Sequence, residues 1–90
     1  MGNSVSYFFR SLNLPAADPA IDDLRELEAP EPMERVLLAC AELQPGNVYL
    51  ARLPHVPVPL FPHLASRGLN WRLHEDPGQG VLLAVFRETP

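Results

Sequence analysis

Apolar residues recur three and four positions apart between residues 33 and 43, and this stripe predicts the clearest helix of the chain. The members of the stripe are Met33, Val36, Leu37, Cys40 and Leu43. Pro30 and Pro32 stand where the first turn is expected, and there the missing proline N–H costs no hydrogen bond. The Pro-Gly turn at residues 44–47 ends the helix. We therefore expect the stripe to pack on a sheet, with Glu34 and Glu42 in solvent.

Four segments have the composition of β-strands. Residues 48–53 and 81–86 are rich in Val and Leu, and residues 81–86 are apolar on both faces. Residues 69–75 alternate with a period of two, as a half-buried strand does. Residues 21–27 are a short, weak candidate that is too polar to be buried on both faces. The Gly-rich loop at residues 76–80 predicts a hairpin between the last two strands.

A second, shorter helix is expected at residues 59–67, where Pro62 fits the first turn and Gly68 the C-terminal end. The predicted order is β-α-β-α-β-β, which places the chain in the α/β class as a two-layer α+β sandwich. Both helices are expected on one face of a mixed four-stranded sheet. Right-handed crossovers make the first two strands parallel, and the short loop makes the last two an antiparallel hairpin.

A polar break between Pro15 and Pro19 divides the chain into an N-terminal arm, residues 1–19, and one domain, residues 20–88. Because both faces of the last strand are apolar, the sheet face without helices needs a cover. Two alternatives for this cover remain, namely the arm and a second copy of the chain in a homodimer. The arm is favoured because it carries apolar residues with no other evident role. These are Tyr7, Phe8, Phe9 and Leu12.

Charge and composition exclude several classes of partner. Seven arginines and no lysine stand against eleven carboxylates, and the net charge of −4 argues against a nucleic-acid partner. No apolar run approaches the ~18–20 residues of a membrane span. Cys40 is the single cysteine, so neither an internal disulfide nor a cysteine-based zinc site is expected. A cytoplasmic location with a reduced thiol is the expectation.

Four arginines near the predicted strands leave open one alternative binding surface. If they align on the sheet face without helices, they form a ladder for an acidic partner or single-stranded RNA. The simpler prediction is that they form surface ion pairs with Glu26, Glu75 and Glu88, and the acidic total favours it. The arginines are Arg25, Arg52, Arg72 and Arg87.

Two segments resemble a known family. Residues 21–32, Ile-Asp-Asp-Leu-Arg-Glu-Leu-Glu-Ala-Pro-Glu-Pro, resemble the opening of TusA/SirA-like sulfur carriers, Leu-Asp-x-x-Gly-Leu-x-Cys-Pro-x-Pro, and residues 43–46, Leu-Gln-Pro-Gly, resemble their next turn. The resemblance covers residues 20–88 and implies a TusA-like sandwich. Residues 30–37 and the His-x-Pro-x-Pro-Leu loop at residues 55–60 look most like an uncharacterised bacterial branch. Members of that branch often occur beside or fused to hemerythrin-like domains.

One departure from the sulfur carriers decides the expected chemistry. Ala29 stands where those proteins have the persulfide-bearing cysteine, and a methyl group can neither form a thiolate nor carry sulfur. Cys40 lies on the apolar stripe and is expected to be a small buried hydrophobe. Glu28, Glu31 and Glu34 put negative charge where an anion would otherwise bind at the helix start. We expect that the sulfur-carrier function is lost.

The candidate site lies at the carboxyl ends of the two parallel strands, because ligands favour that edge of an open sheet. The predicted ligand or partner site comprises Ala29, Pro30, Glu31, Pro32 and His55. His55 with Glu28 or Glu31 could hold a metal ion or a proton, and the alternative is a plain loop histidine. His63 and His74 are expected well apart, so a three-histidine cluster is not expected.

The expected function is that of a non-catalytic cytoplasmic module that acts through protein contacts in redox, sulfur or nitrogen-oxide metabolism. This context rests on the resemblance. Neither a cofactor nor enzyme activity is expected. Two alternatives remain, a weak metal or haem-type site at His55 and residual sulfur transfer through Cys40.

Overall fold

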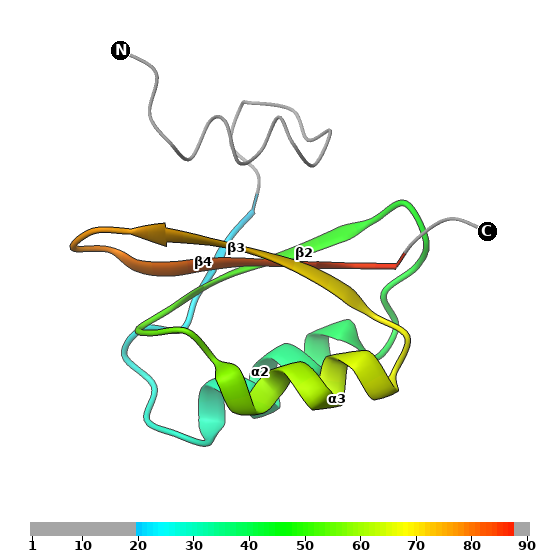
Figure 1. Cartoon of the computed structure of the whole chain (residues 1–90), viewed down its shortest axis with the longest axis horizontal. Helices are drawn as coiled ribbons and strands as arrows, with labels where there is room; N and C mark the ends of the chain where they lie inside the picture. Colours follow the sequence, from blue (N-terminus) through cyan, green and yellow to red (C-terminus); the bar gives the residue numbers. More distant parts are fainter. Residues whose placement is uncertain (1–19, 88–90) are drawn as a thin grey trace, which may run out of the picture.

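Two helices lie on one face of a four-stranded sheet in the computed structural model, which describes residues 20–87 (Figure 1). The elements are β1 (Asp22–Asp23), α2 (Glu31–Cys40), β2 (Val48–Leu53), the 3-10 turn η1 (Val58–Leu60), α3 (Phe61–Ser66), β3 (Asn70–Asp76) and β4 (Gly80–Phe86). This arrangement confirms the expected β-α-β-α-β-β order and the two-layer α+β class.

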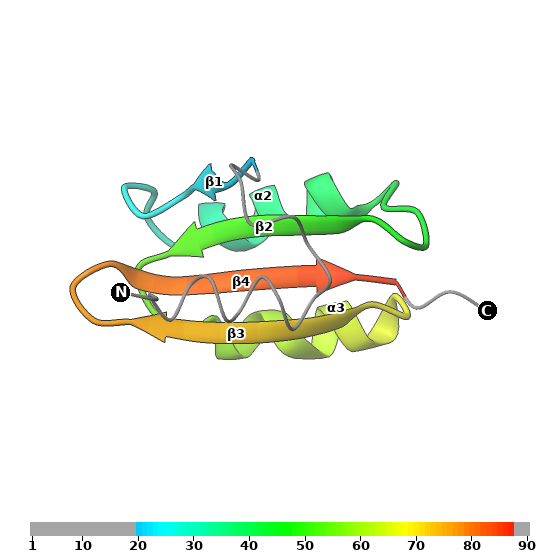
Figure 2. The ribbon, with the colours of Figure 1, turned by 90° about the horizontal axis from the view of Figure 1, so that it is seen from above.

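The strands lie in the order β1-β2-β4-β3, so the last strand of the chain occupies an inner position (Figure 2). β1 runs parallel to β2, and β4 pairs antiparallel with both β2 and β3. The predicted parallel pair and the predicted hairpin are both present. Since β4 has a neighbour on each side, its backbone is paired along both edges, and an apolar strand suits this place.

The first strand is much shorter than the expected 21–27, and its own side chains explain why. Only Asp22 and Asp23 pair with β2. The Asp23 carboxylate then accepts the backbone N–H of Arg25 at 3.2 Å, which makes a local turn. The next backbone bond, from Leu27 N–H to the Leu24 carbonyl, closes the turn and takes the chain away from the sheet.

Helix α2 begins at the predicted prolines but ends at Cys40, three residues before Leu43. Pro45 disfavours a helical backbone at the residue before it, and the N–H of Leu43 bonds the carbonyl of Cys40 at 3.2 Å. The stripe faces the sheet as predicted, with Val36 and Cys40 fully buried. Leu37 is only half-buried, because the helix turns it toward the edge of the contact, although it still packs on the core.

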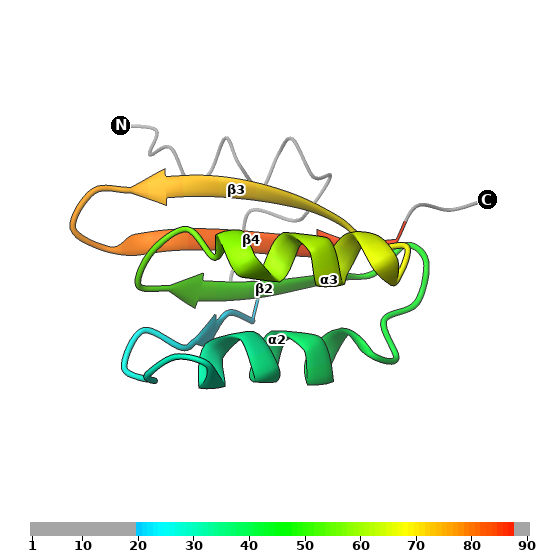
Figure 3. The same ribbon diagram turned by 60° about the horizontal axis from the view of Figure 1, so that its bottom comes forward.

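The main core lies between the helices and the sheet. It is built from the side chains of β2 and β4 that face α2 and α3, among them Leu53, Leu83 and Val85. Phe61 at the start of α3 stacks on Trp71 of β3, with ring centroids 5.0 Å apart. This contact fixes α3 over the β3 side of the sheet, while α2 covers the β2 side (Figure 3).

A second apolar cluster lies on the opposite surface of the sheet, which we call the helix-free face. It contains Leu50, Leu82 and Ala84, with Ile21 and Val48 packed against it. Leu82 and Ala84 have no exposed surface. Both faces of β4 are therefore buried, as its composition predicted. The predicted arm, residues 1–19, and the end of the predicted domain at residue 88 lie outside the described residues.

Candidate functional site

Two proline-rich segments meet at the carboxyl ends of β1 and β2. The first connects β1 to α2, and the second leaves β2 at Leu53 and leads into η1. Both lie at the same end of the domain in Figure 3, where the start of α2 and the arrowhead of β2 are close together. Parallel pairing of β1 with β2 is the reason, because it directs both strands toward one edge of the sheet.

A small apolar cavity of about 140 Å³ lies between these two segments. Its lining includes five prolines, namely Pro30, Pro32, Pro54, Pro57 and Pro59. Leu27, Ala29, Met33, Leu53 and Val56 supply the remaining carbon surface. His55 is the one titratable residue of the lining. We call this hollow the proline cavity.

The composition of the proline cavity determines what it can hold. Proline offers no backbone N–H and has a fixed φ angle, so these walls are stiff and poor in hydrogen-bond donors. A cavity of ~150 Å³ lined with carbon is about large enough for a benzene-sized group. A drug-sized ligand needs ~300–1,000 Å³. The proline cavity is therefore suited to one apolar side chain or a similarly small apolar group.

Four of the five residues proposed from the sequence line this cavity. Ala29, Pro30, Pro32 and His55 meet there, whereas Glu31 is exposed in the first turn of α2 and is not part of the lining. That these residues bind a ligand or partner stays a prediction. Apart from His55, the lining residues contributed by the end of β2 and the loop that follows it were not part of the predicted site. The density of prolines at residues 54–59 is the signal that could have identified them.

His55 is exposed and borders a second, shallower depression. The far wall of that depression is the β3–β4 hairpin, which contributes Glu75 and Asp76. The sequence hypothesis paired His55 with Glu28 or Glu31, and neither lines either hollow. Within the described residues, no group of three or more His, Cys, Asp or Glu side chains is placed to hold a metal ion.

Cys40 lies in the main core and outside the lining of both hollows. Burial raises the pKa of its thiol to about 11, and the positive charge of Arg87 offsets only part of this rise. A thiol must ionise to act as a nucleophile. The structure therefore argues against sulfur transfer through Cys40 and agrees with the expected role as a buried apolar residue.

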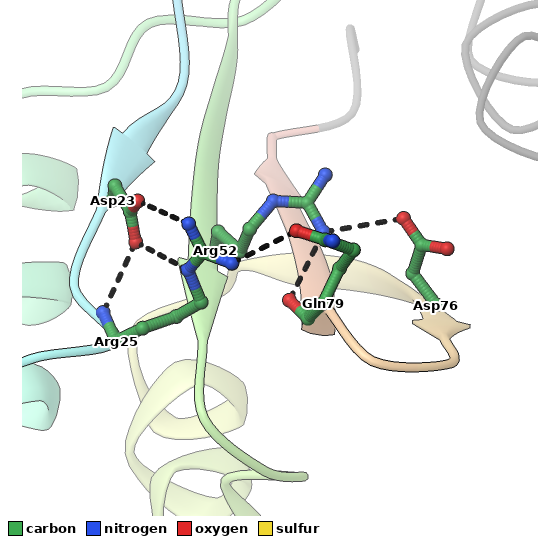
Figure 4. Close-up of polar contacts among 5 residues, drawn as sticks. All are labelled: Asp23, Arg25, Arg52, Asp76 and Gln79. Carbon is green, nitrogen blue, oxygen red and sulfur yellow. Dashed lines mark hydrogen bonds and ion pairs between the residues drawn. The ribbon is translucent and has the colours of Figure 1, made fainter.

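A polar network on the helix-free side ties β1 to the β3–β4 turn (Figure 4). The Asp23 carboxylate accepts hydrogen bonds from the Arg25 guanidinium at 2.7 and 2.8 Å, and these bonds lower the pKa of Asp23 to about 2. Arg25 also donates to the Gln79 side chain at 3.0 Å. Arg52 donates to the Gln79 carbonyl at 3.2 Å and to the Asp76 carboxylate at 3.4 Å.

The network bears on the predicted arginine ladder. Arg25 and Arg52 are engaged by carboxylates, as the simpler prediction of ion pairs required, although their partners are Asp23 and Asp76 rather than the expected glutamates. Arg87 is not part of any ladder. Its guanidinium turns to the other side of the sheet and donates to the carbonyls of Leu43 and Arg67.

Comparison with known proteins identifies one family. A family model described as an uncharacterized conserved protein, DUF2249, matches residues 23–86 and so covers the span from β1 to β4. No curated protein and no solved structure matches the chain significantly. Among the described residues, no helix has the length and apolar character needed to cross a bilayer. The resemblance to TusA/SirA-like sulfur carriers stays a prediction.

Proposed function

The chain belongs to the DUF2249 family, and we propose that it is a non-catalytic module that binds a partner protein through the proline cavity. The cavity accepts one apolar side chain of the partner. The observation that carries this proposal is the lining itself, which joins five prolines and five aliphatic or small residues around a volume of about 140 Å³.

The surroundings of the cavity define the chemistry of the partner segment. Glu28, Glu31 and Glu34 are exposed on the segment that leads into α2 and on its first turn. The whole chain carries a net charge of −4. Complementary charge on a partner steers association and raises specificity. We therefore expect the apolar side chain to be flanked by arginine or lysine.

The cellular context of the proposal rests on the sequence resemblance. Residues 21–32 resemble the opening of sulfur carriers, but Ala29 stands in place of the reactive cysteine, so this position lacks the nucleophile. We place the partner in redox, sulfur or nitrogen-oxide metabolism of the cytoplasm. The contact then serves assembly or positioning rather than group transfer.

Peptide titration followed by nuclear magnetic resonance tests the proposal. Burying one leucine side chain contributes ~1.5–3 kcal/mol, so a short peptide should bind weakly, with a Kd of roughly 6–80 mM. The probe is a pentapeptide with a leucine between two pairs of arginines, and the matched probe has serine at the centre. The leucine peptide should shift the signals of Met33, His55 and Val56, and the serine peptide should not.

A pair of variants separates the cavity from the rest of the surface. Ala29→Phe places a ring in the cavity and should abolish the shifts, whereas Ala39→Phe adds the same ring at an exposed position on α2 away from it. The proposal fails if the two peptides bind alike, if Ala29→Phe binds as well as Ala39→Phe, or if the leucine peptide causes no shifts.

A further inference from the structure

The proline cavity adjoins the second depression, which we call the hairpin depression. Pro54, His55 and Val56 line both hollows, so these three residues form a wall that the two share. The opposite wall of the hairpin depression is the β3–β4 hairpin, which contributes residues 75–78 and 80–81. A partner segment with a side chain in the proline cavity therefore lies next to the hairpin depression as well.

The strand register indicates how far apart the two hollows are. Leu53 on β2 pairs with Val81 on β4, and Val81 pairs with Glu75 on β3. Directly opposite residues point to the same face of a sheet, so this row faces the helices, where Leu53 belongs to the main core. Leu53 lines the proline cavity and Glu75 lines the hairpin depression. Two strand spacings, or ~10 Å, therefore separate the two positions.

The two carboxylates of the hairpin depression differ in what they already bind. Asp76 is half-buried and accepts a hydrogen bond from Arg52 at 3.4 Å, so a cation of the domain offsets its charge (Figure 4). Glu75 is exposed, and within residues 20–87 its carboxylate has neither an ion pair nor a hydrogen bond. Glu75 is therefore the carboxylate that a positively charged group of a partner can pair with.

We propose that the hairpin depression binds an arginine or lysine side chain two positions away from the apolar residue that enters the proline cavity. The inference rests on the proposed function and adds the position of the basic residue and the group that recognises it. In an extended segment, side chains two positions apart point to the same side and lie ~7 Å apart, and the flexible stem of a basic side chain covers the remaining distance. The stem packs on the carbon surface of Pro54 and Pro77, while the charged end pairs with Glu75.

Two peptides of identical composition test the position of the basic residue. Arg-Gln-Leu-Gln-Arg has arginine two positions from the leucine, whereas Gln-Arg-Leu-Arg-Gln has arginine next to it. Glu75→Gln should bind the first peptide roughly two- to fivefold more weakly than the parent, as expected for one exposed ion pair, and should bind the second as the parent does. Glu42→Gln removes the same charge at an exposed position beyond the C-terminal end of α2 and should bind both peptides like the parent.

Exchange of the charges distinguishes a direct contact from a general effect of net charge. Glu75→Lys should prefer Glu-Gln-Leu-Gln-Glu over Arg-Gln-Leu-Gln-Arg, and the parent should have the opposite preference. If the leucine peptides shift the signals of Met33 and Val56 in the parent, the proposed function stands. The inference is then overturned by an unchanged preference in Glu75→Lys, by no loss in Glu75→Gln, or by equal losses for both arginine peptides. If no leucine peptide shifts those signals, the proposed function fails and the inference fails with it.

Discussion

The substitution Gly80→Ala should destabilise the domain far more than Gly78→Ala, although both glycines have the same backbone angle. Each has φ near +80°, a conformation that costs an L side chain ~1–2 kcal/mol. The surroundings differ. A Cβ at Gly80 would collide with the carbonyl oxygen of Leu53, whereas a Cβ at Gly78 meets nothing within 4 Å.

The collision at Gly80 cannot be relieved by a side-chain rotation, because the position of a Cβ is fixed by its own backbone and the Leu53 carbonyl is itself a backbone group. Leu53 pairs with Val81, so the two strands are held together at this point. Forcing an extra methyl group into a packed contact costs ~1–3 kcal/mol beyond the conformational penalty. We expect a loss of ~1–2 kcal/mol for Gly78→Ala and ~2–5 kcal/mol for Gly80→Ala. The larger loss is a major part of the ~5–15 kcal/mol that stabilises a typical domain.

The same collision should also change the shape of the proline cavity. The lining residue Leu53 ends β2 and is followed at once by Pro54 and His55, so a displaced carbonyl changes the path of this loop. Gly80→Ala should weaken binding of the leucine peptide, and Gly78→Ala should leave it unchanged.

Urea unfolding followed by the fluorescence of Trp71 measures both variants on one scale. The dependence on urea should be unchanged and the midpoint should fall, since the surface exposed on unfolding is the same. If the two variants lose equal stability, the close approach of Gly80 to Leu53 is wrong and the hairpin lies farther from the end of β2.

Three further predictions concern the core and the titrating groups. Leu37→Ala should lower the free energy of unfolding by ~2 kcal/mol, the low end of the range for a core leucine, because Leu37 is half-buried. Leu38→Ala, at a side chain that is 76% exposed, should lower it by less than ~0.5 kcal/mol. Equal thermal midpoints of the two variants would mean that the buried face of α2 is wrongly assigned. Cys40 should react with thiol reagents only after unfolding, and rapid labelling of the native protein at neutral pH would contradict its burial. The free energy of unfolding should fall as the pH rises from about 9 to about 11, because the thiol of the unfolded chain ionises at a lower pH than the thiol of the folded chain. Carbon NMR should find that the Asp23 carboxyl has a pKa of about 2 instead of 3.8. Its stabilising contribution is therefore complete above a pH of about 3.8 and is lost as the pH falls from there through about 2. Arg25→Gln should return the pKa toward 3.8, and an unchanged pKa in that variant would exclude Arg25 as the cause.

The local sequence pattern was sufficient to predict the order of the elements and the buried face of α2. The spacing of Val36 and Cys40 depends on residues within two helical turns, so the sequence itself carries that information. The same holds for the two-sided apolar character of β4 and for the proline-rich segments that come to line the cavity. Helix and strand ends were less certain. The shortness of β1 depends on competition between backbone and side-chain hydrogen bonds, and the early end of α2 depends on the backbone bond from Leu43 to Cys40 ahead of Pro45.

By itself, the sequence determined the element types, the α+β class and the position of Ala29, Pro30, Pro32 and His55 near one edge of the sheet. Only the tertiary structure decided that β4 lies between β2 and β3, that Arg52 meets Asp76, and that Glu31 stays outside the cavity. The physical reason is the range of the interactions. Periodicity and turn chemistry act over a few residues, whereas strand order and register arise from pairing between segments that are distant in the chain.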